Sequence, residues 1–249
     1  MRPPSVHPIK VFVISLTRST ERRAAIVERM TQAGVNFEFF DAVDGQEKGF
    51  LYSDRADPEM TFKRKGYHLQ PGEVACYASH YLLWKKCVDL DQPIVILEDN
   101  IGVVDEFGLL LTQVERQTEK YGYIKLSAMR EAKRFRPLER INDNFYLGVF
   151  SRGTTGASGY LVSPSAARSF MMHSQKFIVP CDDFMEQRWV HGIQALNISP
   201  SPCWRESVTS TIGTNRKQKS QRNPTRRLSI YLFRLYEKLM RKIYWVRKT

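Results

Sequence analysis

The sequence has few cysteines and no cysteine pattern typical of metal binding. Its four cysteines, Cys76, Cys87, Cys181 and Cys203, form no CxxC pair, and we identify no histidines near them at zinc-site spacing. A disulfide framework is not expected in a chain of 249 residues with so few cysteines. We therefore predict reduced thiols that lie in or near the core.

Long hydrophobic runs and the common nucleotide-binding motifs are also absent. No run approaches the roughly 18 apolar residues that span a bilayer, and the apolar stretch from Val11 to Leu16 is too short for a secretory signal. Neither GxGxxG nor GxxxxGK[ST] occurs, which argues against Rossmann dinucleotide binding and P-loop chemistry. Ser158 is not in a nucleophile-elbow sequence. We expect the protein to remain in the cytoplasm.

Acidic residues are nearly missing from the C-terminal end. Residues 214–249 hold 12 of the 38 lysines and arginines but a single acid, Glu237, whereas the rest of the chain is almost neutral. With 42% hydrophobic residues, the chain has enough apolar material for a globular core. We predict a domain over residues 1–213 and a basic tail over residues 214–249.

What the sequence does contain is an alternation of apolar strand segments and helical segments. Buried strands are predicted at 9–16, within 37–45 before a turn at Asp44-Gly45, and at 93–100, 123–128 and 160–162. A weaker candidate is 145–150, while 46–70 is polar and irregular. Helices are predicted within 18–34, where Ser19 or Thr20 is the cap, at 71–89 and 105–122, from Pro164, and over 178–193, with an extended segment at 195–203. This pattern predicts an open, mostly parallel α/β sheet with helices on both faces.

Two acidic groups follow such segments. PIVILEDN (93–100) ends a buried strand with Glu98, Asp99 and Asn100, at the sheet edge where ligands bind in this architecture. Asp182 and Asp183 stand at the start of another helix. Acids at these places hold a divalent cation such as Mg²⁺ or Mn²⁺, act in acid–base catalysis, or cap a helix and form salt bridges, and the pattern alone leaves these alternatives open.

Arginines are concentrated just after the first strand. RSTERR places Arg18, Arg22 and Arg23 at the beginning of a predicted helix, and helix N-termini and arginines both attract phosphate. The alternative is that some of these side chains only cover the helix surface.

Several segments together resemble a known family. VISLTRSTERRAAIVERM, FFDAVDG, GEVACYASHYLLWKKCV, PIVILEDN, GTTGASGYLVSPSAAR and VPCDDFM occur in an order similar to that of glycosyltransferase family 25, over about residues 10–205. These are sugar transferases of lipooligosaccharide synthesis in Gram-negative bacteria. The resemblance implies a GT-A fold, inversion at the anomeric carbon, a UDP-galactose or UDP-glucose donor, and a lipid-linked oligosaccharide acceptor.

The resemblance also implies roles for individual residues. Glu98, Asp99 and Asn100 match an acidic metal-binding triplet for Mn²⁺ or Mg²⁺, and Asp183 or Asp182 is the expected catalytic base. The expected donor-binding residues are Ser15, Leu16, Arg18, Arg22, Arg23, Ser79, His80, Asn100 and Lys125. For His80, a hydrogen-bonded structural role within a helix is the alternative.

The third position of the triplet departs from the family pattern. Asn100 stands where the family has a carboxylate. An amide oxygen still ligates hard cations, but the site loses one negative charge. Weaker metal binding, a changed coordinating residue, metal independence, and a contact from Asn100 to the donor ribose or a donor hydroxyl are therefore open alternatives. The departure also keeps a second hypothesis, a catalytically impaired scaffold or binding protein.

The basic tail ends in an amphipathic segment. Leu228, Leu232, Leu235, Leu239 and Ile243 recur at helical spacing, with arginines and lysines on another face. This composition is typical of a helix that lies on an anionic membrane, which predicts a peripheral protein on the inner face of the cytoplasmic membrane. A helix packed on its own domain or in a homodimer is the alternative. Nucleic-acid binding is not expected, because no nucleic-acid motif accompanies the basic residues.

Overall fold

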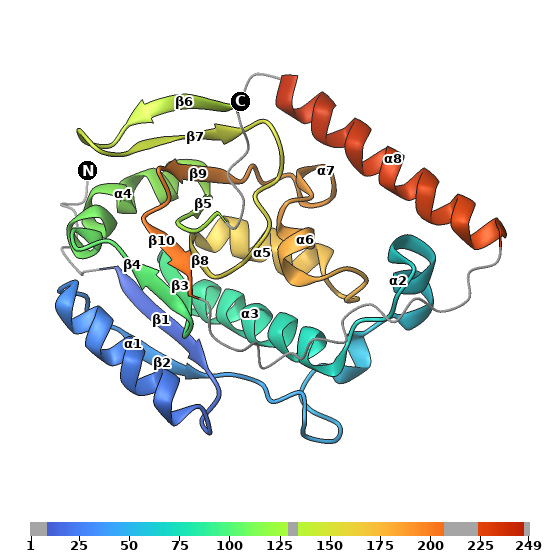
Figure 1. Cartoon of the computed structure of the whole chain (residues 1–249), viewed down its shortest axis with the longest axis horizontal. Coiled ribbons are helices and arrows are strands. Elements are labelled where there is room, and N and C mark those ends of the chain that lie inside the picture. Colours follow the sequence, from blue (N-terminus) through green and yellow to red (C-terminus); the bar gives the residue numbers. More distant parts are fainter. Residues whose placement is uncertain (1–8, 129–133, 207–223, 247–249) are drawn as a thin grey trace.

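A computed structural model describes residues 9–128, 134–206 and 224–246 of the chain (Figure 1). Its main feature is an eight-stranded sheet with the order β2-β1-β3-β8-β5-β9-β7-β6. Its strands are β1 (Lys10–Ser15), β2 (Glu38–Asp41), β3 (Ile94–Glu98), β5 (Tyr123–Lys125), β6 (Phe135–Arg140), β7 (Tyr146–Phe150), β8 (Gly159–Val162) and β9 (Leu196–Ser199). Only β7 and β8 run against the common direction.

Helices cover both faces of this sheet, because its central strands are apolar on both sides. Phe12 and Ile94 face one core with the helices α3 (Pro71–Leu90), α5 (Pro164–His173) and α6 (Cys181–Met185). Val11 and Val95 face the opposite core with α1 (Thr20–Gln32) and α4 (Phe107–Tyr121). The expected α/β class, with an open, mostly parallel sheet between helices, is confirmed.

A second, two-stranded sheet lies beside the ligand edge. β4 (Ile101–Val103) pairs antiparallel with β10 (Cys203–Arg205), which places Arg205 opposite Ile101. As a result, residues that follow β3 and residues near position 205 lie close together although the sequence separates them widely.

Three local predictions were wrong. The segment 46–70 is not wholly irregular, since it contains a short 3₁₀ turn (Ser53–Arg55) and the helix α2 (Pro58–Lys65), which Asp57 caps by accepting a hydrogen bond from the Met60 N–H at 2.9 Å. The single helix expected over 178–193 is divided into α6 and α7 (Arg188–His191). The mixed segment before β7 contains the edge strand β6, which sequence analysis did not predict.

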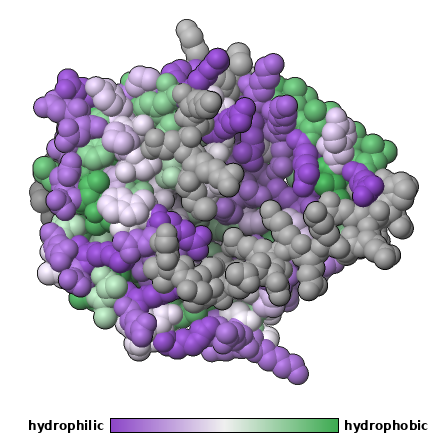
Figure 2. Space-filling model, in the orientation of Figure 1, coloured by the Kyte–Doolittle hydropathy of each residue, from purple (hydrophilic) through white to green (hydrophobic). Residues whose placement is uncertain are grey.

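The C-terminal helix α8 (Pro224–Val246) lies across α2 and α7 (Figure 1). Ile230 and Glu237 are buried on its inner side, so the helix packs on its own domain. On the outer side, apolar residues gather at the upper right of Figure 2, over α8. The exposed members of this stripe are Leu228, Tyr231, Leu232, Leu235, Tyr236, Leu239 and Ile243.

Two further observations concern the tail and the membrane. Residues 207–223, the first part of the predicted tail, lie outside the described residues. In the described part of the chain, no helix has both the length and the apolar character that crossing a bilayer requires.

Candidate active site

A cavity of about 360 Å³ opens at the carboxyl ends of β1 and β3. The first turn of α1, the segment after β2, the N-terminal half of α3 and β10 close it from the other sides. The lining residues are 14–16, 18, 19, 22, 42–46, 70–72, 75, 76, 79, 80, 98–100 and 205. The cavity therefore lies where sequence analysis predicted a ligand edge.

Close backbone packing holds the rim of this cavity. A Cβ atom on Gly45 would lie 2.7 Å from the Pro71 carbonyl oxygen, so the turn after β2 approaches α3 as only glycine allows. At the start of α3, the backbone N–H of Gln70 donates to the Glu73 carboxylate at 3.0 Å, as part of a capping box.

The three arginines after β1 have different surroundings. Arg18 and Arg22 line the cavity, where Arg18 Nη2 lies 3.1 Å from Asp44 Oδ1 and Arg22 Nη1 lies 3.3 Å from Asp99 Oδ1. Arg23 does not line it. Its guanidinium donates to the Ser15 carbonyl at 2.9 Å and pairs with Asp41, so it fastens the end of β1 to β2. Two cationic side chains thus face the cavity from this segment.

The acidic triplet is divided between two sets of partners. Asp99 accepts from the Ser15 hydroxyl at 2.7 Å and from Arg22, which places it against β1 and α1. Glu98 accepts from the Ser158 hydroxyl at 3.1 Å, and its Oε1 lies 3.9 Å from His80 Nε2 on α3. The side chain of Asn100 is buried, and its Oδ1 has no hydrogen-bond partner in the part of the chain that the structure describes.

Glu98 is ionised in this environment. Burial raises the pKa of its carboxyl, but the nearby His80 imidazole, the Arg205 charge and the Ser158 hydroxyl together outweigh burial and hold the pKa below its usual value. Glu98 therefore supplies a fixed negative charge at the inner wall of the cavity.

A second cavity, of about 250 Å³, adjoins the first. It is lined by residues 73, 76, 98, 155–158, 180–182 and 205, so Cys76, Glu98 and Arg205 border both cavities. Asp182 lines the second cavity, where its two oxygens accept from the backbone N–H groups of Gly156 and Asp183, each at 3.0 Å. Burial and the neighbouring Asp183 charge raise the pKa of Asp182.

The remaining predicted residues are only partly brought together. Leu16, Ser79 and His80 line the first cavity, and the Ser79 hydroxyl accepts from the Val43 N–H at 2.9 Å. Lys125 lines neither described cavity: it is buried and its Nζ lies 2.7 Å from Glu186 Oε1. Asp183 also lines neither, because its carboxylate accepts from Lys65 Nζ at 2.8 Å.

Comparison with known proteins decides the family. The sequence profile of glycosyltransferase family 25 (LPS biosynthesis protein) matches residues 8–185. The chain belongs to this family. It is 26% identical to the lipooligosaccharide biosynthesis protein lic2B of Haemophilus influenzae, over 94% of each chain.

Other members of family 25 include proteins with different descriptions. The lacto-N-neotetraose biosynthesis glycosyltransferase LgtE of Neisseria meningitidis is 27% identical over 78% of this chain and 73% of its own. A mouse protein named inactive glycosyltransferase 25 family member 3 is 29% identical over 71% of this chain but only 31% of its own. Membership in the family is therefore compatible with an active and an inactive site.

The oxygen atoms near the triplet fit the divalent cation that the family resemblance implies. The unpartnered Asn100 Oδ1 offers a carbonyl oxygen within the cavity wall, and carboxylate oxygens keep a lone pair after accepting one hydrogen bond. Oxygen donors of this kind suit Mn²⁺ or Mg²⁺. Asp99 has the least freedom to join them, because Ser15 and Arg22 already engage both of its oxygens.

Sequence analysis missed two residues at the junction of the cavities. Arg205 belongs to no motif, and only the pairing of β10 with β4 brings it there. Its positive charge acts on Glu98 and helps to lower the pKa of that carboxyl. Cys76 precedes His80 by four residues, a spacing that brings the two side chains to one face of a helix. The prediction that no histidine lies near a cysteine at metal-site spacing was therefore wrong.

Proposed function

We propose that the chain is an inverting glycosyltransferase that transfers galactose or glucose from a UDP-sugar to an oligosaccharide acceptor of the lipooligosaccharide core. The observation that supports it most is the pair of adjoining cavities, one lined by arginines and the other by the partly buried Asp182. Transfer needs two binding sites that meet at the reacting carbon, and these cavities meet at Cys76, Glu98 and Arg205.

The first cavity is proposed to bind the donor. Arg18, Arg22 and the first turn of α1 favour an anionic group such as a diphosphate. Arg205 lines the same cavity beside Glu98, and a donor phosphate would give it a second anionic partner. Asn100, Ser79 and His80 are proposed to position the remaining parts of the donor.

A bound Mn²⁺ or Mg²⁺ would neutralise negative charge on the leaving diphosphate. Glu98, Asp99 and Asn100 are the proposed ligands, with Asn100 Oδ1 as the donor atom that has no other partner. Arg205 would share this task, because it borders both cavities.

Asp182 is the proposed catalytic base. As the acceptor oxygen forms a bond to the anomeric carbon, its proton passes to the Asp182 carboxylate, and the bond between that carbon and the diphosphate oxygen breaks on the opposite face. Asp183, the other base expected from the sequence, is engaged by Lys65. The proposal therefore assigns Asp183 to positioning α6 against α2.

A membrane role is proposed for α8. Arg227, Arg234, Lys238 and Lys242 flank its exposed apolar stripe, which gives the helix the charge that anionic lipids attract. Binding there would bring the enzyme to a lipid-linked acceptor on the inner face of the cytoplasmic membrane. A second copy of the chain is the competing occupant of this stripe.

The alternative function is a catalytically impaired scaffold, which the Asn100 substitution and the inactive mouse relative favour. A screen of nucleotide sugars separates the two. We expect one UDP-sugar to raise the melting temperature, with a larger effect in Mn²⁺, and the same sugar to appear in a lipooligosaccharide product. Donor binding without transfer would support the scaffold, and failure of every UDP-sugar to bind would contradict both the donor assignment and the enzyme.

A further inference from the structure

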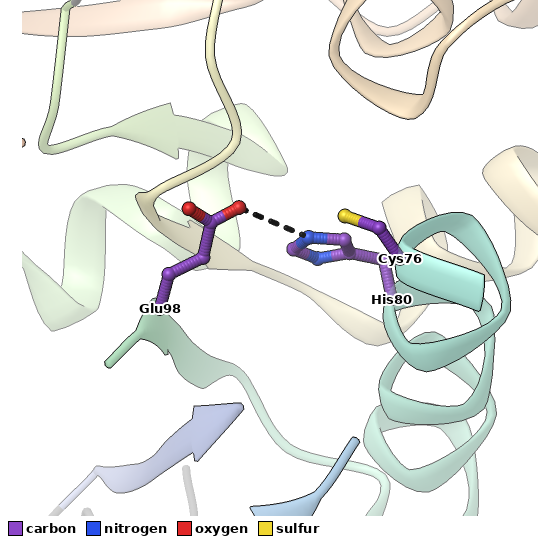
Figure 3. Close-up of side chains that lie close together, drawn as sticks. All are labelled: Cys76, His80 and Glu98. Carbon is purple, nitrogen blue, oxygen red and sulfur yellow. Dashed lines mark ion pairs between the residues drawn. The ribbon is translucent and has the colours of Figure 1, made fainter. Parts of the chain in front are cut away.

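We propose that Cys76, His80 and Glu98 form a binding site for a thiophilic divalent cation, of which Zn²⁺ is the leading candidate. Figure 3 shows the three side chains converging from α3 and from the end of β3. One ligand atom from each lies within 4.8 Å of the other two. This goes beyond the proposed function, because the site requires neither a UDP-sugar nor transfer.

The helix supplies two of the ligands by its geometry. Cys76 and His80 are four residues apart in α3, so their side chains lie on the same face, one turn from each other. Glu98 ends the strand that packs against this face, and Ser158 fixes its Oε2 so that Oε1 is directed to the imidazole. The arrangement is thus built from two rigid elements rather than from loops.

His80 gives the independent evidence for a ligand. Its side chain is fully buried, yet its Nε2 makes no hydrogen bond to any described residue, because Glu98 Oε1 at 3.9 Å is too distant. A buried polar atom left without a partner destabilises the fold. A cation between Nε2 and Oε1 would satisfy both atoms.

The other ring nitrogen of His80, Nδ1, already has the kind of hydrogen bond that orients histidine ligands of metals. His80 Nδ1 lies 2.9 Å from the Tyr160 hydroxyl, which also accepts from Trp84 Nε1 at 3.0 Å. With a cation on Nε2, the ring proton resides on Nδ1 and donates to the Tyr160 oxygen. Such outer hydrogen bonds orient histidine ligands at metal sites.

The ligand types indicate which cation binds. A thiolate and an imidazole favour Zn²⁺ or Co²⁺ over Mg²⁺, and together with the carboxylate they carry two negative charges, which a divalent ion balances. Binding releases the Cys76 thiol proton as the sulfur–metal bond forms. Zn²⁺ bonds of about 2.0–2.3 Å require the ligand atoms to move together by roughly 1 Å.

The position of the site gives it an open side. Cys76 and Glu98 border both cavities, so a fourth coordination position would face the junction between them. Three protein ligands and one exchangeable position are typical of catalytic rather than structural zinc. The two proposed sites share Glu98, but Asp99 and Asn100 take no part in this one, which adds Cys76 and His80 instead.

Cobalt absorption tests the site directly. Protein stripped of metal by a chelator and kept reduced is titrated with Co²⁺. We expect one equivalent to bind with a thiolate-to-cobalt charge-transfer band that Zn²⁺ abolishes. Cys76→Ser should remove the band, and His80→Gln should weaken Co²⁺ binding at least about 10-fold.

Two control variants complete the experiment. Cys87 lies on the same helix, but its thiol donates hydrogen bonds to the Gln92 and Val162 carbonyls, so Cys87→Ala should keep the band. Asp99→Asn should keep it too, because this change alters only the oxygen-donor triplet. Thermal unfolding of each variant checks that it is folded. Absence of the band in the unaltered protein, or an unchanged band in Cys76→Ser, would overturn the proposal, whereas UDP-sugar binding measured in parallel reports on the proposed function separately.

Discussion

The pKa values of two carboxyl groups that line the second cavity are shifted in opposite directions. Glu98 has a lowered pKa because His80, Arg205 and Ser158 outweigh its burial, whereas Asp182 has a raised pKa because burial and Asp183 dominate. Paired carboxyl groups with divergent pKa values are typical of divided chemical roles. Here the separation favours Glu98 as a permanent charge and Asp182 as the group that takes up a proton.

Asp182→Asn is expected to lower kcat by about 100-fold or more, since an amide cannot take up the proton of the attacking hydroxyl group. Because the pKa of Asp182 is raised, the carboxylate is protonated at a higher pH than an ordinary aspartate, so the acid limb of the kcat/KM profile should lie above the usual aspartate range and activity should fall as pH drops through it. Steady-state kinetics between pH 4 and 9 measure both effects, on the order-of-magnitude scale of general base catalysis.

Asp183→Asn provides the comparison. It breaks the ion pair with Lys65, so we expect a lower melting temperature and a smaller loss of kcat. A larger kcat loss in Asp183→Asn than in Asp182→Asn would assign the base to Asp183 instead.

Arg205→Gln is expected to raise the Kd of UDP roughly 10- to 100-fold, the equivalent of one or two charge-assisted hydrogen bonds. The fold should be unaffected, because Arg205 holds no other described side chain. Calorimetric titration with UDP measures the change, with Arg168→Gln, an exposed surface arginine beside Asp91, as the matched control. Equal UDP affinity in Arg205→Gln and the unaltered protein would remove Arg205 from the donor site.

At the scale of elements, the break between α6 and α7 shows why a continuous helix was wrongly predicted. Glu186 turns inward to pair with the buried Lys125, and Gln187 is buried against Glu237 of α8 at 3.1 Å. Both partners are distant in sequence. Satisfying these buried polar groups is worth more than continuing the helical hydrogen bonds through two residues.

His191 makes this junction sensitive to pH. Its Nε2 lies 3.1 Å from the Phe184 carbonyl, and its Nδ1 accepts from the Ile193 N–H at 3.1 Å, so the buried ring is neutral. Burial lowers its pKa to about 4. The unfolded chain takes up a proton near pH 6.5 that the folded chain refuses, and stability is therefore lost as pH falls from about 6.5 to about 4.

Urea unfolding should show about 2 kcal/mol less stability at pH 5 than at pH 7 from this group alone. His191→Gln should flatten that dependence, while His68→Gln, at an exposed position, should leave it unchanged. A slope that is the same in His191→Gln and the unaltered protein would show that other groups dominate.

At the scale of the whole molecule, α8 joins the membrane proposal to the proposed active site. Its inner side contacts the domain through Glu237, which accepts from Lys65 at 3.4 Å, and Lys65 in turn holds Asp183. Arg241 stacks over Trp189 of α7. The helix is thus part of the folded domain while its leucine stripe stays exposed, and both the packing alternative and the amphipathic prediction describe part of it.

Vesicle binding is expected to depend on both the exposed apolar stripe of α8 and the basic residues beside it. The protein should sediment with anionic phosphatidylglycerol vesicles and be released by high salt, because screening weakens attraction of lysine and arginine to the leaflet. Leu235→Glu should abolish binding, and Leu109→Glu, at an exposed position of α4, should not.

Sedimentation velocity of the same proteins tests whether a second copy of the chain, rather than a membrane, covers the apolar stripe of α8. If Leu235→Glu converted a dimer into a monomer and the unaltered protein ignored anionic vesicles, the stripe would be a contact between two copies of the chain rather than a membrane surface.

The sequence by itself determined the local features. Apolar, β-branched runs predicted the strands around Val11, Val95 and Leu161, and Pro164 marked the start of α5, because side-chain periodicity and backbone restriction act over a few neighbouring residues. Six short segments in order were enough to recognise the family, which the profile over residues 8–185 confirms.

Only the tertiary structure decided which side chains meet. The order of strands in the sheet, the arrival of Arg205 beside Glu98, the burial of Lys125 against Glu186 and the approach of His80 to Glu98 all join residues far apart in the chain. The sequence placed Glu98, Asp99 and Asn100 side by side as one triplet. Folding separates their partners, because Glu98 faces α3 and Asp99 contacts β1 and α1, and periodicity along one strand carries no information about which elements pack on its two faces.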